Sequence, residues 1–254
     1  MGMQKRELAV QLYTLRQETA KDFPRVLEQV AEAGYSGVEF AGYGSETPAR
    51  LRGILDDLGM VTAGCHVGLA QLESRLDGVI EDIKTLGAHH LACPSIPEAR
   101  RQTADDYRRI GEQLGQIGER CKAAGLQLSY HNHAFEFAQF DGRYALDILT
   151  EAANPDLLML ELDLGWVDHA GLDPVELIGR YTGRVPTLHF KDMSRDPQLF
   201  DAPVGDGRLP IPELIAAGRE AGTEWFIVEQ DHPQGSAIEC VRRSAAFMRD
   251  QGVM

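Results

Sequence analysis

Short apolar runs rich in β-branched and aromatic residues alternate along the chain with longer stretches in which apolar residues recur every three or four positions. The short runs are typical of buried strands, and the longer stretches are typical of amphipathic helices. A regular alternation of the two predicts a parallel sheet covered by helices. The predicted strands, eight in number, are Leu8–Leu15, Gly37–Ala41, Val61–Val67, Leu91–Pro94, Leu126–His133, Leu157–Leu164, Val185–Lys191 and Trp225–Asp231.

Three of the predicted helices have limits that are visible in the sequence. Phe23–Ala33 carries its apolar residues on one face and is followed by Gly34, a residue type that commonly ends a helix. Ala104–Ala124 repeats apolar residues at steps of three and four. Glu213–Ala221 follows two prolines and stops before Gly222, so both of its ends carry a helix signal.

The length of the chain, 254 residues, suits one closed barrel of eight strand–helix units better than an open sheet with a second domain. No linker, low-complexity tract or block of like charge divides the sequence. We therefore expect residues 1–254 to form a single (β/α)8 TIM barrel, an α/β fold. In such barrels the functional side chains lie at the C-terminal ends of the strands.

Composition narrows the partners and the location of the protein. The net charge of −14 repels nucleic-acid phosphates and anionic membranes, so we expect neither as a partner. The four cysteines are scattered and form no CxxC pair, which indicates reduced thiols rather than a zinc knuckle. Met1–Glu7 leads into an apolar run that is too short and too polar for a signal sequence, so we expect a cytoplasmic protein.

Four successive predicted strands end in an imidazole or a carboxylate: His131, Asp163, His189 and Glu229. In a barrel these side chains reach the same end, where two buried carboxylates repel each other unless a cation lies between them. Two imidazoles and two carboxylates are a normal ligand set for zinc, manganese or a similar ion. We therefore expect one divalent metal ion per chain, whether manganese, zinc, cobalt or magnesium.

A set of short motifs extends this expectation along nearly the whole chain. They are Gly34–Phe40, Tyr130–Phe137, Leu162–Trp166, Ala170–Pro174, Leu188–Asp192 and Val204–Arg208. Together they resemble the xylose isomerase-like TIM barrel family, which includes sugar phosphate isomerases and epimerases, ketose epimerases and inosose dehydratases. Endonuclease IV is a distant relative of these proteins.

The resemblance implies that the four strand-end residues named above hold the metal. Family epimerases typically have Glu where this chain has His131, and His133 or Glu136 is an alternative ligand at that strand. The resemblance further implies a carbohydrate or cyclitol substrate and a homodimeric or homotetrameric assembly.

For such a site the resemblance implies proton abstraction next to the carbonyl of a ketose, keto-sugar or keto-cyclitol, through a metal-stabilised enediolate. Glu229 is the expected base, and His131 is the group expected on the opposite face of the substrate. We therefore predict a metal-dependent sugar isomerase or epimerase. Because an imidazole held by a further partner is a poor second base, a metal-dependent lyase or dehydratase is the alternative.

Further residues near the strand ends are candidates for substrate binding. Lys191 shares a face with His189, and it either donates to the substrate or pairs with Asp163 or Glu161. Trp166 either stacks on a sugar ring or packs in the core. The complete set of expected substrate-binding residues is His66, His133, Glu136, Trp166, Lys191 and Arg195.

Two other function classes stay open at this point. Phosphodiester cleavage of the endonuclease IV type uses three zinc ions, and His66 fits that pattern. However, Trp166 and the segment Cys93–Ser95 stand where that activity would need further histidine ligands. A sugar-binding barrel without enzymatic activity is the remaining class.

Overall fold

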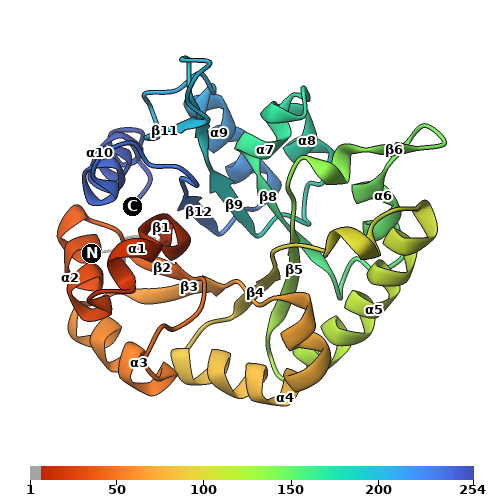
Figure 1. Cartoon of the computed structure of the whole chain (residues 1–254), viewed down its shortest axis with the longest axis horizontal. Helices are drawn as coiled ribbons and strands as arrows, with labels where there is room; N and C mark the ends of the chain where they lie inside the picture. The colour runs from red at the N-terminus through yellow and green to blue at the C-terminus, as the bar shows by residue number, and fades with distance from the viewer. Residues whose placement is uncertain (1–6) are drawn as a thin grey trace.

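The computed structural model describes residues 7–254, so most of the segment Met1–Glu7 considered above lies outside the described part. The main sheet has eight strands, β1 (Leu8–Gln11), β2 (Gly37–Phe40), β3 (Val61–Cys65), β4 (His90–Cys93), β5 (Gln127–His131), β8 (Met159–Asp163), β9 (Thr187–Phe190) and β12 (Trp225–Val228). They are arranged in the order β3-β2-β1-β12-β9-β8-β5-β4, and neighbouring strands run parallel. A parallel bridge between His66 and Ala92 joins the two end strands, so the sheet closes into a barrel surrounded by helices (Figure 1). The predicted TIM barrel is confirmed.

Helices follow most of the strands and cover the outside of the barrel (Figure 1). The longer helices are α2 (Phe23–Ala33), α3 (Pro48–Asp57), α4 (Leu69–Leu86), α5 (Ala104–Ala123), α9 (Ile211–Ala221) and α10 (Ala237–Asp250). Shorter helical segments are η1 (Leu12–Leu15), α1 (Arg16–Thr19), η2 (Glu98–Arg100), η3 (Phe135–Phe137), α6 (Ala145–Glu151), α7 (Leu164–His169) and α8 (Pro174–Arg180). Two small hairpins pair β6 (Gln139–Phe140) with β7 (Arg143–Tyr144) and β10 (Asp192–Met193) with β11 (Asp201–Ala202).

The sequence signals explain most helix ends. Helix α2 stops at Gly34, whose φ of 93° is a conformation that glycine adopts without strain. Helix α5 begins with a capping box in which Thr103 and Asp106 satisfy each other's backbone N–H groups. Helix α9 starts two residues before the predicted Glu213, because Pro212 lies in its first turn.

The predicted strand Leu8–Leu15 is wrong in its second half. Strand β1 ends at Gln11, whose side chain accepts a hydrogen bond from the backbone N–H of Tyr13 and so caps the helical turn η1. Leu12 and Leu15 are nevertheless buried. Their apolar character therefore reflects packing in the core rather than continuation of the strand.

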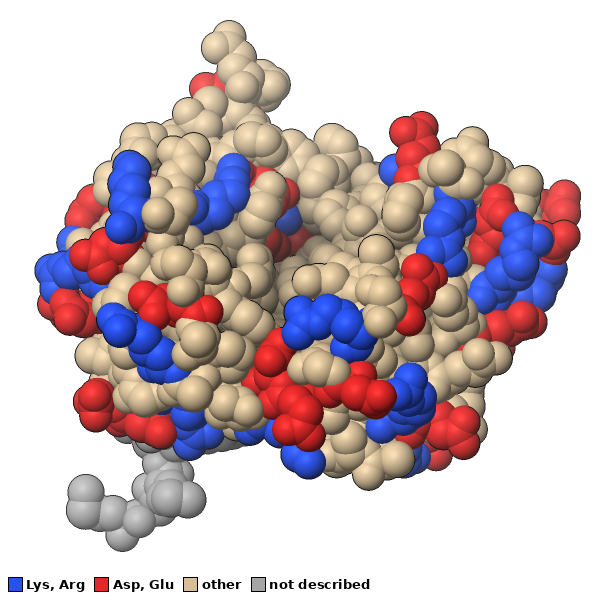
Figure 2. All heavy atoms as spheres, turned by 60° about the horizontal axis from the view of Figure 1, so that its bottom comes forward, with Lys and Arg blue, Asp and Glu red and all other residues tan. Residues whose placement is uncertain are grey.

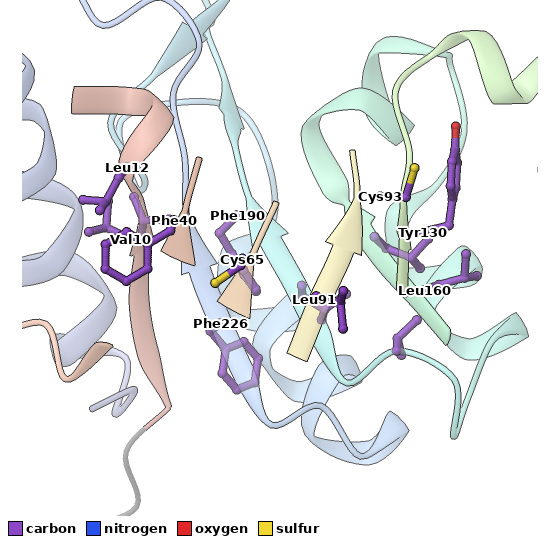
Figure 3. Close-up of a cluster of buried hydrophobic side chains, with 14 of the residues drawn as sticks. Val10, Leu12, Phe40, Cys65, Leu91, Cys93, Tyr130, Leu160, Phe190 and Phe226 are labelled. Carbon is purple, nitrogen blue, oxygen red and sulfur yellow. The ribbon is translucent and has the colours of Figure 1, made fainter. Parts of the chain in front are cut away.

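Apolar side chains fill the layer between the strands and the helices. Buried members of this layer from six of the eight strands include Val10, Phe40, Leu91, Leu160, Phe190 and Phe226 (Figure 3). Inside the barrel, Ala9, Ala63 and Ile227 form a small apolar cluster. Because strand side chains alternate, Gln11 and Glu229 point inward two residues further along their strands. The interior thus changes from apolar to polar toward the C-terminal ends.

A close approach of α7 to β9 fixes one part of the polar end. An added Cβ at Gly165 would lie 2.5 Å from the carbonyl oxygen of Lys191, so a larger residue does not fit there. Asp163 directly precedes α7, and it is therefore held beside the end of the neighbouring strand β9.

The outer surface carries mixed charge. On the face drawn in Figure 2, Lys and Arg side chains are interspersed with Asp and Glu side chains. Exposed ion pairs such as Arg25–Glu28, at 2.6 Å, are typical of this surface. Across residues 7–254, no helix combines the length and the apolar character that crossing a membrane requires.

Candidate functional site

The four strand-end residues expected to bind a metal lie together. His131 ends β5, Asp163 ends β8, His189 lies on β9, and Glu229 follows β12 directly. Each offers one ligand atom, and these atoms all lie within 4.8 Å of one another. All four side chains are buried. The parallel strands of the barrel place them there, because each residue is an inward position at the same end of its strand.

The geometry and chemistry of this cluster fit one divalent cation. His189 Nδ1 lies 2.8 Å from Glu229 Oε2, and His131 Nε2 lies 3.9 Å from Asp163 Oδ2. A tetrahedral shell with bonds of about 2.1 Å separates neighbouring ligand atoms by roughly 3.4 Å, between these two distances. Two nitrogen and two oxygen donors suit zinc, manganese or cobalt.

Backbone contacts hold Asp163 in place. Its side-chain Oδ1 accepts a hydrogen bond from the backbone N–H of Trp166 at 3.0 Å, which caps helix α7. The side-chain amide oxygen of Asn132 accepts the backbone N–H of Asp163, also at 3.0 Å. Asn132 therefore has a structural role between β5 and β8, since its side chain binds backbone rather than a ligand.

Lys191 lies in the middle of the carboxylates of the site. Its Nζ is 2.9 Å from Asp163 Oδ2, 3.3 Å from Glu229 Oε2 and 2.8 Å from Asp231 Oδ2. Burial alone lowers the pKa of a lysine, but these three carboxylates raise the pKa of Lys191 above its usual value. Lys191 is therefore a fixed cation, and the pairing with Asp163 expected from the sequence is present.

The pKa values of the two carboxylates of the cluster are shifted in opposite directions. Burial raises the pKa of Glu229, but Lys191 and His189 outweigh it and hold this pKa well below its usual range. Burial also raises the pKa of Asp163, to about 6, against the opposing effect of Lys191. Glu229 is thus ionised at neutral pH and is able to accept a proton.

The imidazoles of His131 and His133 are neutral. Burial lowers the pKa of His131 well below its usual value. Burial and the neighbouring Lys191 lower the pKa of His133 to about 4. At neutral pH neither ring carries a charge, so neither holds an extra proton that it could deliver as an acid.

A cavity of about 580 Å³ opens above the cluster. Among the residues expected at the site, those that line it are His66, His131, His133, Trp166, Lys191 and Glu229. Two of their nitrogens, His133 Nδ1 and Trp166 Nε1, are buried and have no hydrogen-bond partner within residues 7–254. A ligand with several hydroxyl groups would satisfy both. Lining residues that the sequence did not suggest include Tyr13, Arg16, Gln71, Asp231 and His232.

Two expected substrate-binding residues lie elsewhere. Glu136 is fully buried behind the site, where its carboxylate accepts hydrogen bonds from the Tyr130 hydroxyl at 2.5 Å and the His133 backbone N–H at 2.8 Å. Arg195 is exposed, and its Nε donates to the carbonyl oxygen of Gly207 at 2.6 Å. Neither residue lines the cavity. Their positions therefore give no support to a role in substrate binding, nor to Glu136 as a metal ligand.

A second polar layer lies deeper in the barrel. Glu39 Oε2 accepts a hydrogen bond from Gln11 Nε2 at 2.7 Å and lies 2.7 Å from His189 Nε2. Below His66 lies Glu161, which the sequence suggested only as a partner of Lys191. Glu161 precedes Asp163 by two residues on the same strand, so both side chains point inward. The inward position of Glu161 could therefore have been predicted from the alternation of side chains along the strand.

Comparisons with known proteins concern the family and the fold of the chain. A family model described as "Xylose isomerase-like TIM barrel" matches residues 27–251. An inosose dehydratase of Geobacillus kaustophilus (strain HTA426) is 28% identical over 197 residues, which cover 68% of this chain and 62% of that relative. The match to an inosose dehydratase of Lacticaseibacillus casei, also at 28% identity, covers 58% of this chain and 55% of that relative. The chain thus spans less than two thirds of the length of these curated relatives.

Solved structures match over nearly the whole chain. A sugar phosphate isomerase/epimerase from Parabacteroides distasonis ATCC 8503 has a TM-score of 0.82 and 25% identity, covering 98% of this chain and 96% of that one. A structure described as IOLI protein with a binding zinc atom has a TM-score of 0.78, with coverage of 96% and 97%. Its sequence identity is 15%, so this second likeness concerns the fold.

Replacing His131 by Ala should weaken divalent-metal binding by at least roughly 100-fold, because it removes one of the four ligands. Glu136→Gln is the matched control, since Glu136 is also buried near β5 but faces Tyr130, and it should keep the affinity within about twofold. Competition with a chromophoric chelator measures both affinities. If the Glu136 variant loses the metal while the His131 variant keeps it, the assignment of the strand-β5 ligand is wrong.

Glu136 should also make stability depend on pH. Burial raises its pKa to about 7 despite the hydrogen bond from Tyr130. Its stabilising contribution is therefore complete below pH 4.5, the ordinary value, and is lost as the pH rises through 7. The free energy of unfolding of the wild type, relative to Glu136→Gln, should fall by on the order of 3 kcal/mol across this window. Urea denaturation at a series of pH values measures this difference, and parallel curves would contradict it.

Proposed function

Because this chain belongs to the xylose isomerase-like TIM barrel family, we propose that it is a divalent-metal-dependent dehydratase that eliminates water from a keto-sugar or keto-cyclitol. The observation that carries this proposal is the asymmetry of the site. Glu229 is the carboxylate of the metal-ligand cluster that lines the cavity, and it is ionised, whereas the imidazoles of His131 and His133 in the same lining are neutral.

In this proposal one divalent ion, whether manganese, zinc, cobalt or magnesium, is held by His131, Asp163, His189 and Glu229. The bound ion would act as a Lewis acid that makes the proton next to the substrate carbonyl more acidic. Lys191 keeps Asp163 and Glu229 ionised and prevents two buried carboxylates from repelling each other. The protein thus prepares the site before the substrate enters.

Glu229 is the proposed base. It removes the proton from the carbon next to the carbonyl, and the electron pair of the broken C–H bond delocalises into the carbonyl group. Its low pKa ensures that the carboxylate is ionised before this step. The position of Glu229 on the cavity wall supports this assignment, because a base must reach its proton directly.

The same carboxyl group can complete the elimination. When the C–O bond at the next carbon breaks, the electron pair forms the new C=C bond and the leaving hydroxyl takes the proton from Glu229. Water and an unsaturated ketone result, and Glu229 returns to its ionised form. A single base is sufficient for this sequence, and Glu229 is the carboxylate of the ligand cluster that lines the cavity.

An epimerase that inverts a centre through two bases would need a second acid on the opposite face of the substrate. His131 is the residue expected in that role, and because its ring and that of His133 are both unprotonated at neutral pH, neither holds the proton that such an acid must deliver. This argument favours elimination over the isomerase or epimerase that the sequence alone suggested. The identity of the curated relatives as inosose dehydratases supports the same choice.

The cavity supports a polyhydroxylated substrate. The unpartnered Trp166 Nε1 is a donor for a hydroxyl oxygen, and the neutral His133 Nδ1 is a second polar contact. Trp166 also presents a ring on which the apolar face of a sugar or cyclitol packs. A volume of about 580 Å³ accommodates such a molecule.

Isomerisation with one base is the second candidate. The structure from Parabacteroides distasonis described as a sugar phosphate isomerase/epimerase favours it, because the likeness extends over 98% of this chain. Both reactions begin with the same proton abstraction by Glu229. The two reactions differ in their products. The product of isomerisation has the same mass as the substrate, whereas the product of dehydration is lighter by one water.

Glu229→Gln should lower turnover of an inosose by roughly 10²–10⁴-fold, since the amide cannot take up the proton. Arg195→Ala is the control. The Arg195 side chain is exposed and lies outside the cavity, so its removal should keep turnover within about twofold. Mass spectrometry of the product should show the loss of one water. A product of unchanged mass would establish the isomerase instead, and full activity of the Glu229 variant would remove it as the base.

A further inference from the structure

One oxygen of Glu161 lies against three imidazoles beneath the strand-end cluster. Glu161 is on β8 and is 1% exposed. Its Oε1 lies 2.6 Å from His66 Nε2, 3.2 Å from His189 Nε2 and 3.3 Å from His131 Nδ1. Its Oε2 accepts a hydrogen bond from the hydroxyl of Thr187 at 2.8 Å. Both oxygens of this carboxylate are therefore fixed in position.

The opposite nitrogens of two of these rings face the proposed metal ligands. His131 Nε2 is directed to Asp163, and His189 Nδ1 to Glu229. A neutral imidazole carries one proton, so each ring has one N–H to donate and one lone pair that can bind an ion. Which nitrogen binds the ion thus depends on where the proton is held.

We propose that Glu161 is a positioning residue for the metal site. Its negative charge favours the proton of His131 on Nδ1, 3.3 Å away, and, together with Glu39, the proton of His189 on Nε2, so that His131 Nε2 and His189 Nδ1 are offered to the cation. This inference rests on the metal ligands named in the proposed function. A carboxylate that accepts the second N–H of a metal-binding histidine fixes both the tautomer and the orientation of the ring. For His189 the hydrogen-bond partner of Nε2 is Glu39, whose Oε2 lies 2.7 Å away, and Glu161 adds its charge at 3.2 Å.

The deeper layer has an alternative interpretation as a cation site of its own. His66, His131, Glu161 and His189 offer ligand atoms that all lie within 4.8 Å of one another. However, the three nitrogens surround Oε1 of Glu161 itself, and this oxygen takes the central place that a cation would need. A hydrogen bond from His66 Nε2 and the attraction of the other two rings to the same negatively charged oxygen account for such an arrangement. Glu161 therefore orients the metal ligands and is not itself a metal ligand.

The nitrogen through which each ring binds zinc tests the proposal directly. Long-range ¹H–¹⁵N correlation spectra of the zinc-loaded, histidine-labelled protein distinguish protonated from metal-bound nitrogens. We expect zinc on Nε2 of His131 and on Nδ1 of His189. The reverse pattern would make Glu161 a ligand and overturn the proposal. Bound zinc that shifts neither ring would contradict the metal ligands of the proposed function, and this inference with them.

Variants of the supporting carboxylate provide the second test. Glu161→Gln keeps the size of the side chain and removes its charge. It should weaken zinc binding by roughly 10–100-fold, and His131 should then bind zinc partly through Nδ1. Thr187→Val removes only the hydroxyl that holds Glu161 and should cause a smaller loss of zinc affinity. This variant also tests the proposal if Glu161→Gln does not fold. The control is Ser129→Ala, also inward on β5, whose hydroxyl has no hydrogen-bond partner within residues 7–254 and whose loss should change nothing.

Wild-type zinc affinity in both the Glu161 and the Thr187 variants would overturn the positioning role. Neither measurement uses turnover. An absence of dehydratase activity would therefore count against the proposed reaction alone, and the ligation pattern would still decide the role of Glu161.

Discussion

The concentration of buried carboxylates at one end of the barrel is the constraint on which the rest of the site depends. Glu39, Glu161, Asp163 and Glu229 are each at most 4% exposed. Buried charges are costly unless they are paired and hydrogen-bonded, and repulsion between like charges adds to the cost. Lys191 and the imidazoles supply part of the compensation. A divalent cation between Asp163 and Glu229 would supply the rest, which explains why a fold keeps so many acids in one place.

The barrel provides the rigidity that such a site requires. Each ligand comes from a different parallel strand, and the strands are held by continuous hydrogen bonding and by the apolar layer against the helices (Figure 3). Contacts near the ligands then refine the geometry. Asn132 fixes the backbone of Asp163, and Gly165 allows α7 to begin against β9. The contrast between an ionised Glu229 and the neutral rings of His131 and His133 follows from these fixed neighbours.

Much of the fold and the centre of the site could be predicted from the sequence, because both follow from local alternation. Strand periodicity identified all eight strands of the barrel, and the inward positions at their ends identified His131, Asp163, His189 and Glu229. Leu12 and Leu15 misled the strand assignment, because burial in a helical turn and burial in a strand select the same residue types. Apolar pattern alone does not separate the two.

Contacts between distant segments could not be predicted in the same way. Glu136 and Arg195 looked like site residues from their place in motifs, but the loops after β5 and β9 turn them away from the cavity. Asp231 and Arg16 reach the cavity through loops whose paths depend on tertiary packing. The strand alternation showed that Glu161 points inward. Its three imidazole neighbours could not be predicted, because His131 and His189 lie on two other strands and His66 directly follows a third.

Anomalous diffraction from crystals soaked in zinc or manganese tests the central claim most directly. The account predicts one strong peak per chain within bonding distance of His131, Asp163, His189 and Glu229. A peak centred between His66 and Glu161, or the absence of any peak in this mouth at saturating metal, would contradict it.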